Sequence, residues 1–231
     1  AANDLRKLYT QLYTITATLN HAPLLGRDTL IAGIYAIAGN STLNDTITLD
    51  AKGDSTAVFI FQVAGTFATG DSAVVVLLNG AQACNVFWKV EGKVSLGTAT
   101  VMKGTIVANN AAIDIASGVI LEGRVLSTAG AITINNTTAS MPVGCGSPLL
   151  TGPIAPVFVA SSCYVIFSGN GAVANAGITT AVGDIGTNVT STTGFDPLMV
   201  TGTIHTKPDV STAAAATDLL LVYDYLNALV P

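Results

Sequence analysis

Residues 86–140 read VFWKVEGKVSLGTATVMKG, TIVANNAAIDIASGVILEG and RVLSTAGAITINNTTAS when they are broken after Gly104 and Gly123. Stacking these lines places similar apolar residues in columns with one period of 19 positions. The columns are Val94, Ile113 and Ile132; Phe87, Ile106 and Val125; and Met102 and Leu121. A unit this short cannot bury its own apolar face, so successive units must stack strand on strand around a shared core.

Each 19-residue unit contains three short apolar runs separated by Gly, Asn or Ser, which describes a triangular coil. Within a run the side chains alternate: at residues 113–115, Ile points inward on both sides of an outward Asp114. We therefore predict an all-β protein with a helix, namely a right-handed β-solenoid of triangular coils with a long α-helix packed alongside.

The composition agrees with a solenoid and excludes several other classes of protein. Half of the 231 residues are apolar and only 10% are charged, but the longest solid apolar runs, such as residues 73–78, hold about six residues. A membrane-spanning helix requires about 20. The net charge is −5 and the nine Lys and Arg form no run, so we expect neither nucleic-acid binding nor membrane insertion.

Two helices are expected, one near each end of the chain. Leu5, Leu8, Leu12 and Ile15 share one face of a helix over residues 2–16, and Leu219, Tyr223 and Leu226 do the same over residues 212–229. The two segments resemble each other, because Ala2-Asn3-Asp4-Leu5 with Tyr9 parallels Ala216-Thr217-Asp218-Leu219 with Tyr223.

Three cysteines are too few for a disulfide scaffold, and they show no metal-binding spacing. Cys145 and Cys163 bracket a Gly/Pro-rich link and are the candidate disulfide, the alternative being two unpaired thiols. One bridge suits an exported protein, so we expect a secreted or cell-surface location. Cys84 lies in an apolar stretch and is expected to be a small buried hydrophobe.

Several longer motifs carry a family resemblance. They are Gly33-Ile34-Tyr35, AVFIFQ at residues 57–62, LNGAQACNVFW at residues 78–88, GRVL at residues 123–126, GDIG at residues 183–186 and TGTIH at residues 201–205. Together they cover most of the chain, which resembles the microbial ice-binding (antifreeze) proteins built as an irregular β-solenoid with a flanking helix. The resemblance implies that an ice crystal surface is the binding partner.

The order of these motifs differs from that of the family, in which the GDIG and TIH motifs precede the helix and the coils. We divide the chain into a helix and lead-in (1–32), solenoid coils (33–144), a Gly/Pro-rich link (145–160), the strands and cap that come first in the family (161–211), and a helix (212–231). Two interpretations stay open. The chain is either one permuted domain or a stretch that crosses the junction between neighbours of a tandem array.

The resemblance also implies a flat face that carries a loose Thr-Ala/Gly-X-Thr/Asn motif and holds ordered water that merges with ice. The motif falls at residues 69–72, 98–101, 117–120 and 176–179. It is incomplete at Val101, Ile120 and Ala176, so we expect ice binding of moderate strength. The predicted ice-binding residues are Thr69, Ser72, Thr98, Thr100, Ser117, Thr138 and Thr179. The column of Ser95, Asp114 and Thr133 marks a second candidate face.

No cofactor and no enzymatic activity are expected. Solenoid lyases and hydrolases need converging carboxylates, His, Lys or Arg, whereas Asp71, Glu91, Asp114 and Glu122 fall in different columns. His21 and His205 lie outside the repeat, and Lys103 and Glu122 should stack as a surface ion pair. The alternative function is an adhesion or carbohydrate-binding module in a cell-surface array.

Overall fold

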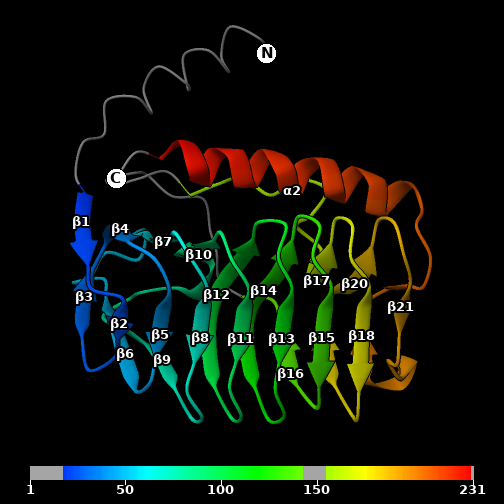
Figure 1. Cartoon of the computed structure of the whole chain (residues 1–231), viewed down its shortest axis with the longest axis horizontal. Helices are drawn as coiled ribbons and strands as arrows, with labels where there is room; N and C mark the ends of the chain where they lie inside the picture. The colour runs from blue at the N-terminus through cyan, green and yellow to red at the C-terminus, as the bar shows by residue number, and fades with distance from the viewer. Residues whose placement is uncertain (1–17, 143–154, 230–231) are drawn as a thin grey trace, which may run out of the picture.

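Three stacks of parallel β-strands form the walls of a solenoid, and a long helix lies along one of them (Figure 1). The computed structural model describes residues 18–142 and 155–229. In each coil the chain passes through one strand of each wall in turn. We name the walls after the three strands of one coil, β7 (Phe59–Val63), β8 (Phe67–Thr69) and β9 (Val74–Leu78). The predicted all-β fold with a helix is therefore confirmed. The helix expected over residues 2–16 lies outside the described residues.

The β7 wall contains β1 (Thr18–His21), β4 (Gly33–Ile37), β7 (Phe59–Val63), β10 (Val86–Val90), the second parts of β12 (Val101–Ala108) and β14 (Ile120–Ser127), β17 (Tyr164–Ser168), β20 (Asp184–Thr187) and β23 (Ile204–His205). The β8 wall contains β2 (Leu24–Leu25), β5 (Ser41–Leu43), β8 (Phe67–Thr69), β11 (Val94–Leu96), β13 (Ile113–Ile115), β15 (Ile132–Asn135), β18 (Val173–Ala176) and β21 (Thr192–Thr193). The β9 wall contains β3 (Thr29–Ile31), β6 (Thr46–Asp50), β9 (Val74–Leu78), the first parts of β12 and β14, β16 (Thr138–Ser140), β19 (Thr180–Val182) and β22 (Val200–Thr201). Short 3₁₀ turns, η1 (Ala83–Asn85) and η2 (Pro197–Met199), precede β10 and β22.

From β10 to β16 the strand register follows the predicted 19-residue period except in two pairs, β10 with β12 and β14 with β16, where the offset is 18 residues. Val94 pairs with Ile113, and Ile113 pairs with Ile132, as expected. Ile106, however, pairs with Trp88 and not with Phe87. The turn that follows β12 is one residue longer than the turn that follows β10, and it absorbs the difference. Phe87 therefore faces outward from the coil and Trp88 faces the core.

The core runs down the axis of the solenoid. The rings of Tyr35, Phe61 and Trp88 stack from coil to coil with centroid separations of 5.4 and 4.0 Å. Trp88 is fully buried, and its Nε1 donates a hydrogen bond to the carbonyl oxygen of Lys103 at 3.0 Å. This bond satisfies the one polar atom of the ring, which allows a large aromatic side chain to be fully buried in the core.

The first coil begins earlier than the sequence predicted. Residues 18–31, expected to be a lead-in, form β1, β2 and β3, which are one complete coil. At the other end, β17, β18 and β19 pair with β14, β15 and β16 and continue all three walls. The permuted order of the motifs itself stays a prediction.

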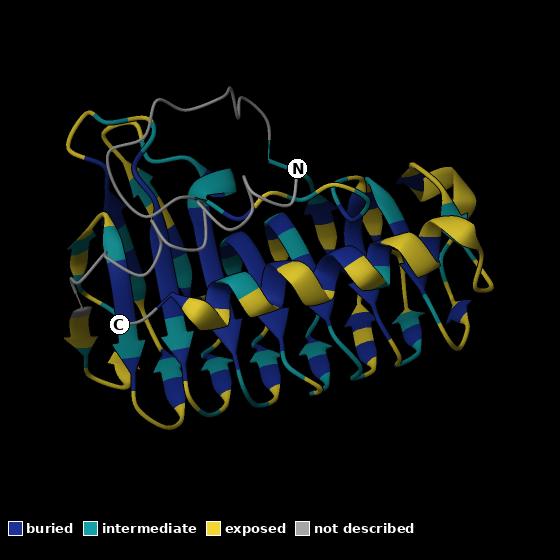
Figure 2. Cartoon of the chain, turned by 90° about the horizontal axis from the view of Figure 1, so that it is seen from above, coloured by how far each residue is buried: buried dark blue, intermediate teal, exposed yellow. Residues whose placement is uncertain are grey.

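The helix α2 (Val210–Ala228) covers the outer side of the β7 wall, in agreement with the predicted range of 212–229. Seen from above in Figure 2, it lies across strands that are coloured as buried. Asp209 caps its first turn by accepting a hydrogen bond from the backbone N–H of Thr212. Leu219, Val222 and Leu226 pack on the outward apolar residues of the β7 wall, such as Phe87.

Side chains of the β7 wall also satisfy the far end of α2. Gln62 Nε2 donates to the carbonyl oxygens of Leu226 and Leu229 at 3.1 and 2.6 Å. Lys89 Nζ donates to Asn227 Oδ1 at 2.8 Å and pairs with the carboxylate of Glu91. The Gln62 amide thus supplies a donor for the last carbonyls of the helix, and the Lys89 cation lies at the end where the helix dipole is negative.

Asp218 joins α2 to the segment that enters β17. Its Oδ2 accepts hydrogen bonds from the backbone N–H groups of Val159 and Ser161, both at 2.9 Å, and from the Ser161 hydroxyl at 2.5 Å. The side chain is 7% exposed. Ser161 is fully buried, so its N–H and hydroxyl depend on this one carboxylate oxygen, whereas Val159 is exposed.

Replacing Asp218 with alanine should therefore lower the free energy of unfolding by about 3 kcal/mol, because buried donors lose their acceptor. In a chain of this size the melting temperature should fall by roughly 6 to 12 °C, as measured by circular dichroism. Asp224→Ala is the matched control, since Asp224 lies on the same helix but is exposed. Equal losses in the two variants would contradict the anchoring role.

The structure corrects the cysteine assignments. Cys84 is disulfide-bonded and Cys163 is a free, exposed thiol. The predicted bridge between Cys145 and Cys163 is therefore wrong, and so is the prediction that Cys84 acts only as a small hydrophobe. Cys145 lies outside the described residues. Sequence separation misled the prediction, because winding the chain into coils brings distant residues together.

Candidate functional site

The outer surface of the β9 wall, here called the β9 face, has its side chains in ordered columns. Register pairing puts six residues in the column nearest the turn from the β8 wall: Thr46, Val74, Val101, Ile120, Thr138 and Thr180. A second column begins with Thr29, Thr48 and Val76 and includes Ser140, Val182 and Thr201 farther along. Nearly all of these residues are β-branched.

This arrangement produces a regular and stiff surface. Neighbouring strands lie about 4.8 Å apart, and side chains on one face of a strand repeat about every 7 Å. Branching at Cβ restricts χ1, so each Thr or Val holds its methyl and hydroxyl groups in nearly fixed positions. The face is partly apolar, with Ile120 49% and Val182 47% exposed. Such a surface can order a layer of water without enclosing a small ligand.

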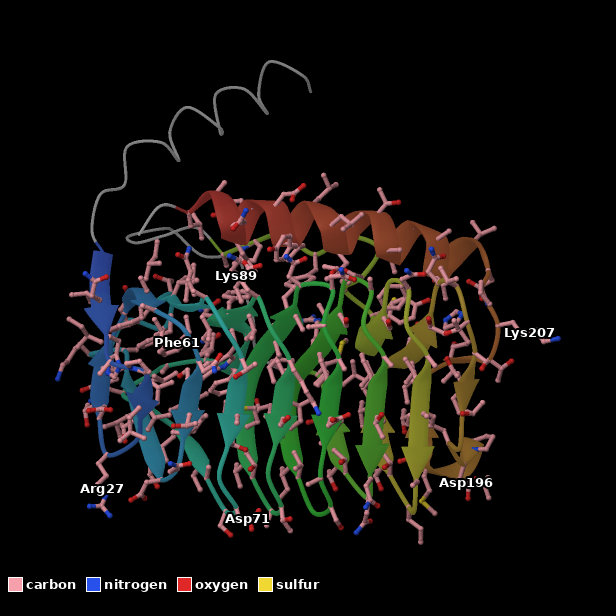
Figure 3. All side chains as sticks on the ribbon, in the orientation of Figure 1. Arg27, Phe61, Asp71, Lys89, Asp196 and Lys207 are labelled. Atoms are coloured by element: carbon pink, nitrogen blue, oxygen red, sulfur yellow. The ribbon has the colours of Figure 1, made fainter. Side chains whose placement is uncertain are left out.

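The turns that lead into the β9 wall form a stacked column of their own. Ser72, Ala99, Gly118, Asn136 and Gly177 all have positive φ, between 44° and 83°. Backbone hydrogen bonds join them from coil to coil: Ala99 N–H donates to the Ser117 carbonyl at 3.0 Å, and Gly118 N–H to the Asn136 carbonyl at 2.8 Å. Gly adopts this conformation freely and Asn more readily than other residues, whereas Ser72 and Ala99 adopt it at a steric cost. The turn residues labelled in Figure 3, Arg27, Asp71 and Asp196, lie along the edge opposite α2.

Four of the seven predicted site residues lie at this surface. Thr98 and Ser72 are exposed in the turns, Ser117 is half-buried in the next turn, and Thr138 is exposed on β16 in the first column. These positions come from different coils and are brought onto one side of the solenoid by the stacking.

The other three predicted residues, Thr69, Thr100 and Thr179, are buried at 8%, 0% and 2% exposure. Thr100 Oγ1 donates to the Gly97 carbonyl at 2.8 Å and lies 2.8 Å from Thr69 Oγ1. Thr179 Oγ1 donates to Asn175 Oδ1 at 2.7 Å. These hydroxyls face inward and support the turns, so we leave them out of the face that we propose below.

The strand register shows that one predicted motif, at residues 69–72, was placed two residues too early. Val101 pairs with Val74, which aligns Thr98 with Asp71 and not with Thr69. The Thr98 N–H donates to Asp71 Oδ1 at 2.8 Å, as expected for neighbours in one column. The motif of this coil is therefore Asp71-Ser72-Ala73-Val74 and not residues 69–72. The positive φ of Ser72 marks the correct alignment, and the sequence offered no comparable signal.

An ion pair interrupts the second column. Lys103 Nζ lies 2.7 Å from Glu122 Oε2, and the two residues are register partners, which confirms the predicted stacking. Both side chains are partly exposed. The pair sits where β12 and β14 bend from the β9 wall into the β7 wall, so in these two coils only the first column of the β9 face is free of charge.

The outer surface of the β8 wall, here called the β8 face, is the second candidate. Its outward column is Thr42, Ala68, Ser95, Asp114, Thr133, Ala174 and Thr193, so the predicted alignment of Ser95, Asp114 and Thr133 is confirmed. Asp114 forms an ion pair with Lys93 at 2.5 Å in the middle of this face. Alternation of small residues and charge makes the β8 face less uniform than the β9 face.

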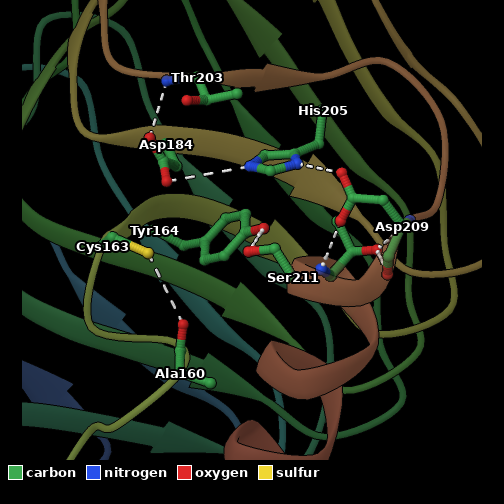
Figure 4. Close-up of polar contacts among 9 residues, drawn as sticks. Ala160, Cys163, Tyr164, Asp184, Thr203, His205, Asp209 and Ser211 are labelled. Carbon is green, nitrogen blue, oxygen red and sulfur yellow. Dashed lines mark hydrogen bonds and ion pairs between the residues drawn. The ribbon is translucent and has the colours of Figure 1, made fainter.

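His205 has a structural environment at the start of α2 (Figure 4). Its Nδ1 lies 2.6 Å from Asp209 Oδ2, and this hydrogen bond holds the pKa of the Asp209 carboxyl below its usual value. The His205 ring packs on the Tyr164 ring with centroids 5.2 Å apart. It thus ties β23 and β17 to the helix cap. Residues 18–142 and 155–229 contain no cluster of three or more His, Cys, Asp or Glu suited to a metal ion.

Comparison with known proteins points in one direction. Residues 1–140 match the sequence model of a family described as ice-binding-like. Ice-binding protein 1 of Shewanella frigidimarina is 36% identical over 113 residues, which are 48% of this chain and 13% of that protein. The ice-binding protein of Nostoc sp. (strain HG1) is 36% identical over 117 residues, 50% of this chain and 43% of that protein. The chain spans less than half the length of these two relatives.

Solved structures give the same result. The crystal structure of an ice-binding protein from an Antarctic Flavobacteriaceae bacterium is 55% identical, with a TM-score of 0.55, over 100% of this chain and 54% of that one. The ice-binding protein of the Antarctic ascomycete Antarctomyces psychrotrophicus is 34% identical, with a TM-score of 0.51, over 58% of this chain and 66% of that one. In the described residues, no helix is long and apolar enough to cross a membrane.

Proposed function

Because the chain belongs to the ice-binding-like family, we propose that it adsorbs to ice through the β9 face and so inhibits the growth or recrystallisation of ice. The observation that carries the assignment of the face is its column of outward β-branched residues, which runs without a charged side chain from Thr46 to Thr180. The β8 face carries the Lys93–Asp114 ion pair at its middle, where strongly hydrated charges oppose an ice-like arrangement of water.

Adsorption works through water held by the face. Thr hydroxyls on strands about 4.8 Å apart can anchor waters at regular intervals, while the methyl groups between them leave the water few competing partners. Such bridging waters are nearly as favourable in enthalpy as direct hydrogen bonds, and a rigid site lowers the entropy cost of holding them. An ice surface extends this ordered layer, and the bound protein then blocks further growth at that place.

The first column has a gap of three consecutive strands, at Val74, Val101 and Ile120, where no hydroxyl is available. We expect the double variant Val101→Thr/Ile120→Thr to raise thermal hysteresis about twofold, since it restores water anchors between the existing Thr positions. Ala68→Thr, on the β8 face, is the control and should leave activity unchanged. A decrease in the double variant would contradict water ordering by hydroxyls at this column.

The proposed function is tested directly by measuring thermal hysteresis in a nanolitre osmometer and the coarsening of a polycrystalline ice film. The chain should hold a seed crystal at a fixed size below the melting point and slow recrystallisation. A glycan array on the same sample tests the alternative of a carbohydrate-binding module. Glycan binding without any effect on ice would overturn the proposal.

We also propose that the protein acts outside the cell or at its surface, where it meets ice. The disulfide at Cys84 supports this location, because structural disulfides persist in oxidising compartments. Maintained melting temperature after treatment with a reductant that opens this bridge would remove the support.

A further inference from the structure

The two ends of the solenoid carry strand edges that are free to pair. Within residues 18–142 and 155–229, β1, β2 and β3 each pair with one strand, and so do β21, β22 and β23 at the other end. The chain after β23 covers one backbone group of the last coil, because the Thr206 carbonyl accepts the Thr192 N–H at 3.4 Å. The other groups on these edges can pair with a strand of another chain.

The last coil is hollow on its outer side. A cavity of about 500 Å³ lies between β21, the turn after it and β23, and Phe195 and Ile204 are among its apolar walls. Thr192 also lines this cavity and is 4% exposed, yet its Oγ1 has no hydrogen-bond partner in the described residues. Ser168 and Thr187, by contrast, donate to carbonyls of the coil beside them at 2.7 and 2.6 Å. A further coil stacked on this end would fill the cavity and bring carbonyls toward the unsatisfied hydroxyl.

The first coil exposes apolar side chains that suit such a cavity. Leu19, Leu24 and Ile31 are 45%, 61% and 50% exposed. Leu19 pairs with Tyr35, which belongs to the core, so Leu19 points toward the axis of the solenoid and is nevertheless half exposed. Inward residues of the middle coils, such as Trp88, are fully buried between the coils on both sides.

The inward positions of the two ends match when one end is stacked on the other. They are Leu19 on β1 and Leu30 on β3 at the first coil, and Ile204 on β23 and Val200 on β22 at the last, because each pairs with a core residue of the coil beside it. With β23 of one copy beside β1 of the next, Ile204 meets Leu19. With β22 beside β3, Val200 meets Leu30. A slip of one residue would turn these side chains outward, so the register is specified.

Opposite charges lie at corresponding corners of the two ends. Arg27, between β2 and β3, and Asp196, between β21 and β22, both lie on the edge opposite α2, at the two ends of the solenoid (Figure 3). Asp196 is exposed, and so is 86% of the Arg27 side chain. Arg27 already forms an ion pair at 2.7 Å with Asp45 of the neighbouring coil. Stacking would bring Arg27 of one copy toward Asp196 of the next, which favours a second copy of this chain as the partner.

We propose that copies of this chain associate head to tail, with the first coil of one copy stacked on the last coil of another and Leu19 seated at the cavity. The contact joins two unlike ends, so every pair retains a free end of each kind and further copies can add in a row. The association does not depend on ice. Its consequence that stacked copies present their β9 faces end to end, and bind ice more tightly together, rests on the proposed function.

Analytical ultracentrifugation of the full chain over a range of concentrations tests the association. The weight-average mass should rise with concentration beyond the mass of two chains. Leu19→Lys puts a charge on the first coil and Thr206→Arg obstructs the cavity of the last, so each variant by itself should remain a single chain. Leu221→Lys and Thr217→Arg, at exposed positions of α2, are the matched controls and should associate as the unchanged chain does.

Mixing the two variants distinguishes head-to-tail stacking from other kinds of association. Leu19→Lys retains an intact last coil and Thr206→Arg an intact first coil, so an equal mixture should form pairs of chains and nothing larger. A mixture that stays at the mass of one chain, or an unchanged chain that does so at every concentration, would refute head-to-tail stacking. Association of Leu19→Lys by itself would refute it as well, because such assemblies would not use the first coil.

A charge exchange between the two ends tests the orientation of the copies without altering the cavity. Arg27→Asp and Asp196→Arg should each weaken the association, because each places like charges at the corner where the copies meet. The double variant Arg27→Asp/Asp196→Arg should regain most of it, since opposite charges then face each other again. Circular dichroism melting curves of all variants check that they fold. A folded double variant that associates no better than the single ones would show that these corners do not meet.

Discussion

Replacing Thr138 with tyrosine should abolish nearly all thermal hysteresis and leave the fold intact. Thr138 is exposed in the first column of the β9 face, between Ile120 and Thr180. A phenol ring would rise above the level of its neighbours, which lie about 4.8 Å away, and would hold a flat crystal plane off the whole face. Tyrosine is favourable in strands, so the melting temperature should be unchanged.

Thr133→Tyr is the matched control. Thr133 lies in the same coil and is also exposed, and its replacement by tyrosine adds the same volume. It differs from Thr138 in pointing outward from the β8 wall. Its activity should equal that of the unchanged chain in the nanolitre osmometer. If Thr133→Tyr abolishes activity and Thr138→Tyr does not, the β8 face is the one that meets ice and our assignment is wrong.

Gly123→Ala should destabilise the fold most strongly of the single substitutions considered. Gly123 is buried and pairs with Gly104 where the chain bends between the β9 and β7 walls. A Cβ at position 123 would lie 1.8 Å from the carbonyl oxygen of Gly104, which is backbone and cannot turn aside. Two stacked coils would have to separate locally, which should cost more than about 3 kcal/mol.

We expect Gly123→Ala to lower the melting temperature by about 10 °C or more and to reduce soluble yield. Gly33→Ala is the control, because a Cβ there would meet the end of the Leu19 side chain at 3.3 Å and the Tyr35 ring at an ordinary contact distance of 3.9 Å. That flexible side chain can move. A Gly123→Ala protein as stable as Gly33→Ala would show that the spacing of the coils tolerates a methyl group at the bend.

Much of the wall structure could be predicted because it depends on local patterns. Alternation within three residues sends Ile113 and Ile115 inward and Asp114 outward, and the structure has them so. The helical spacing of Leu219, Tyr223 and Leu226 likewise identified the face of α2 that is buried. In each case the fate of a side chain depends on residues within one turn of helix or one strand.

The errors about which side chains face inward concern the corners of the coils. Whether Phe87 or Trp88 faces the core depends on the length of the turns after β10 and β12. Thr69 is a turn hydroxyl that faces inward because Thr100, 31 residues later, lies beside it and bonds to it. The motif pattern treats Thr69 and Thr98 alike, although one is buried and the other exposed.

By itself, then, the sequence determined the stacking of coils, the inward and outward positions along each strand, and the helical element that covers one wall. These follow from periodicity, since a period in apolar residues must be buried in a repeating structure. Only the tertiary structure decided which hydroxyls form the β9 face and that Cys84 is bridged while Cys163 is free. The physical reason is that these outcomes depend on contacts between coils, and a change of one residue in a turn shifts the register of the strand beside it.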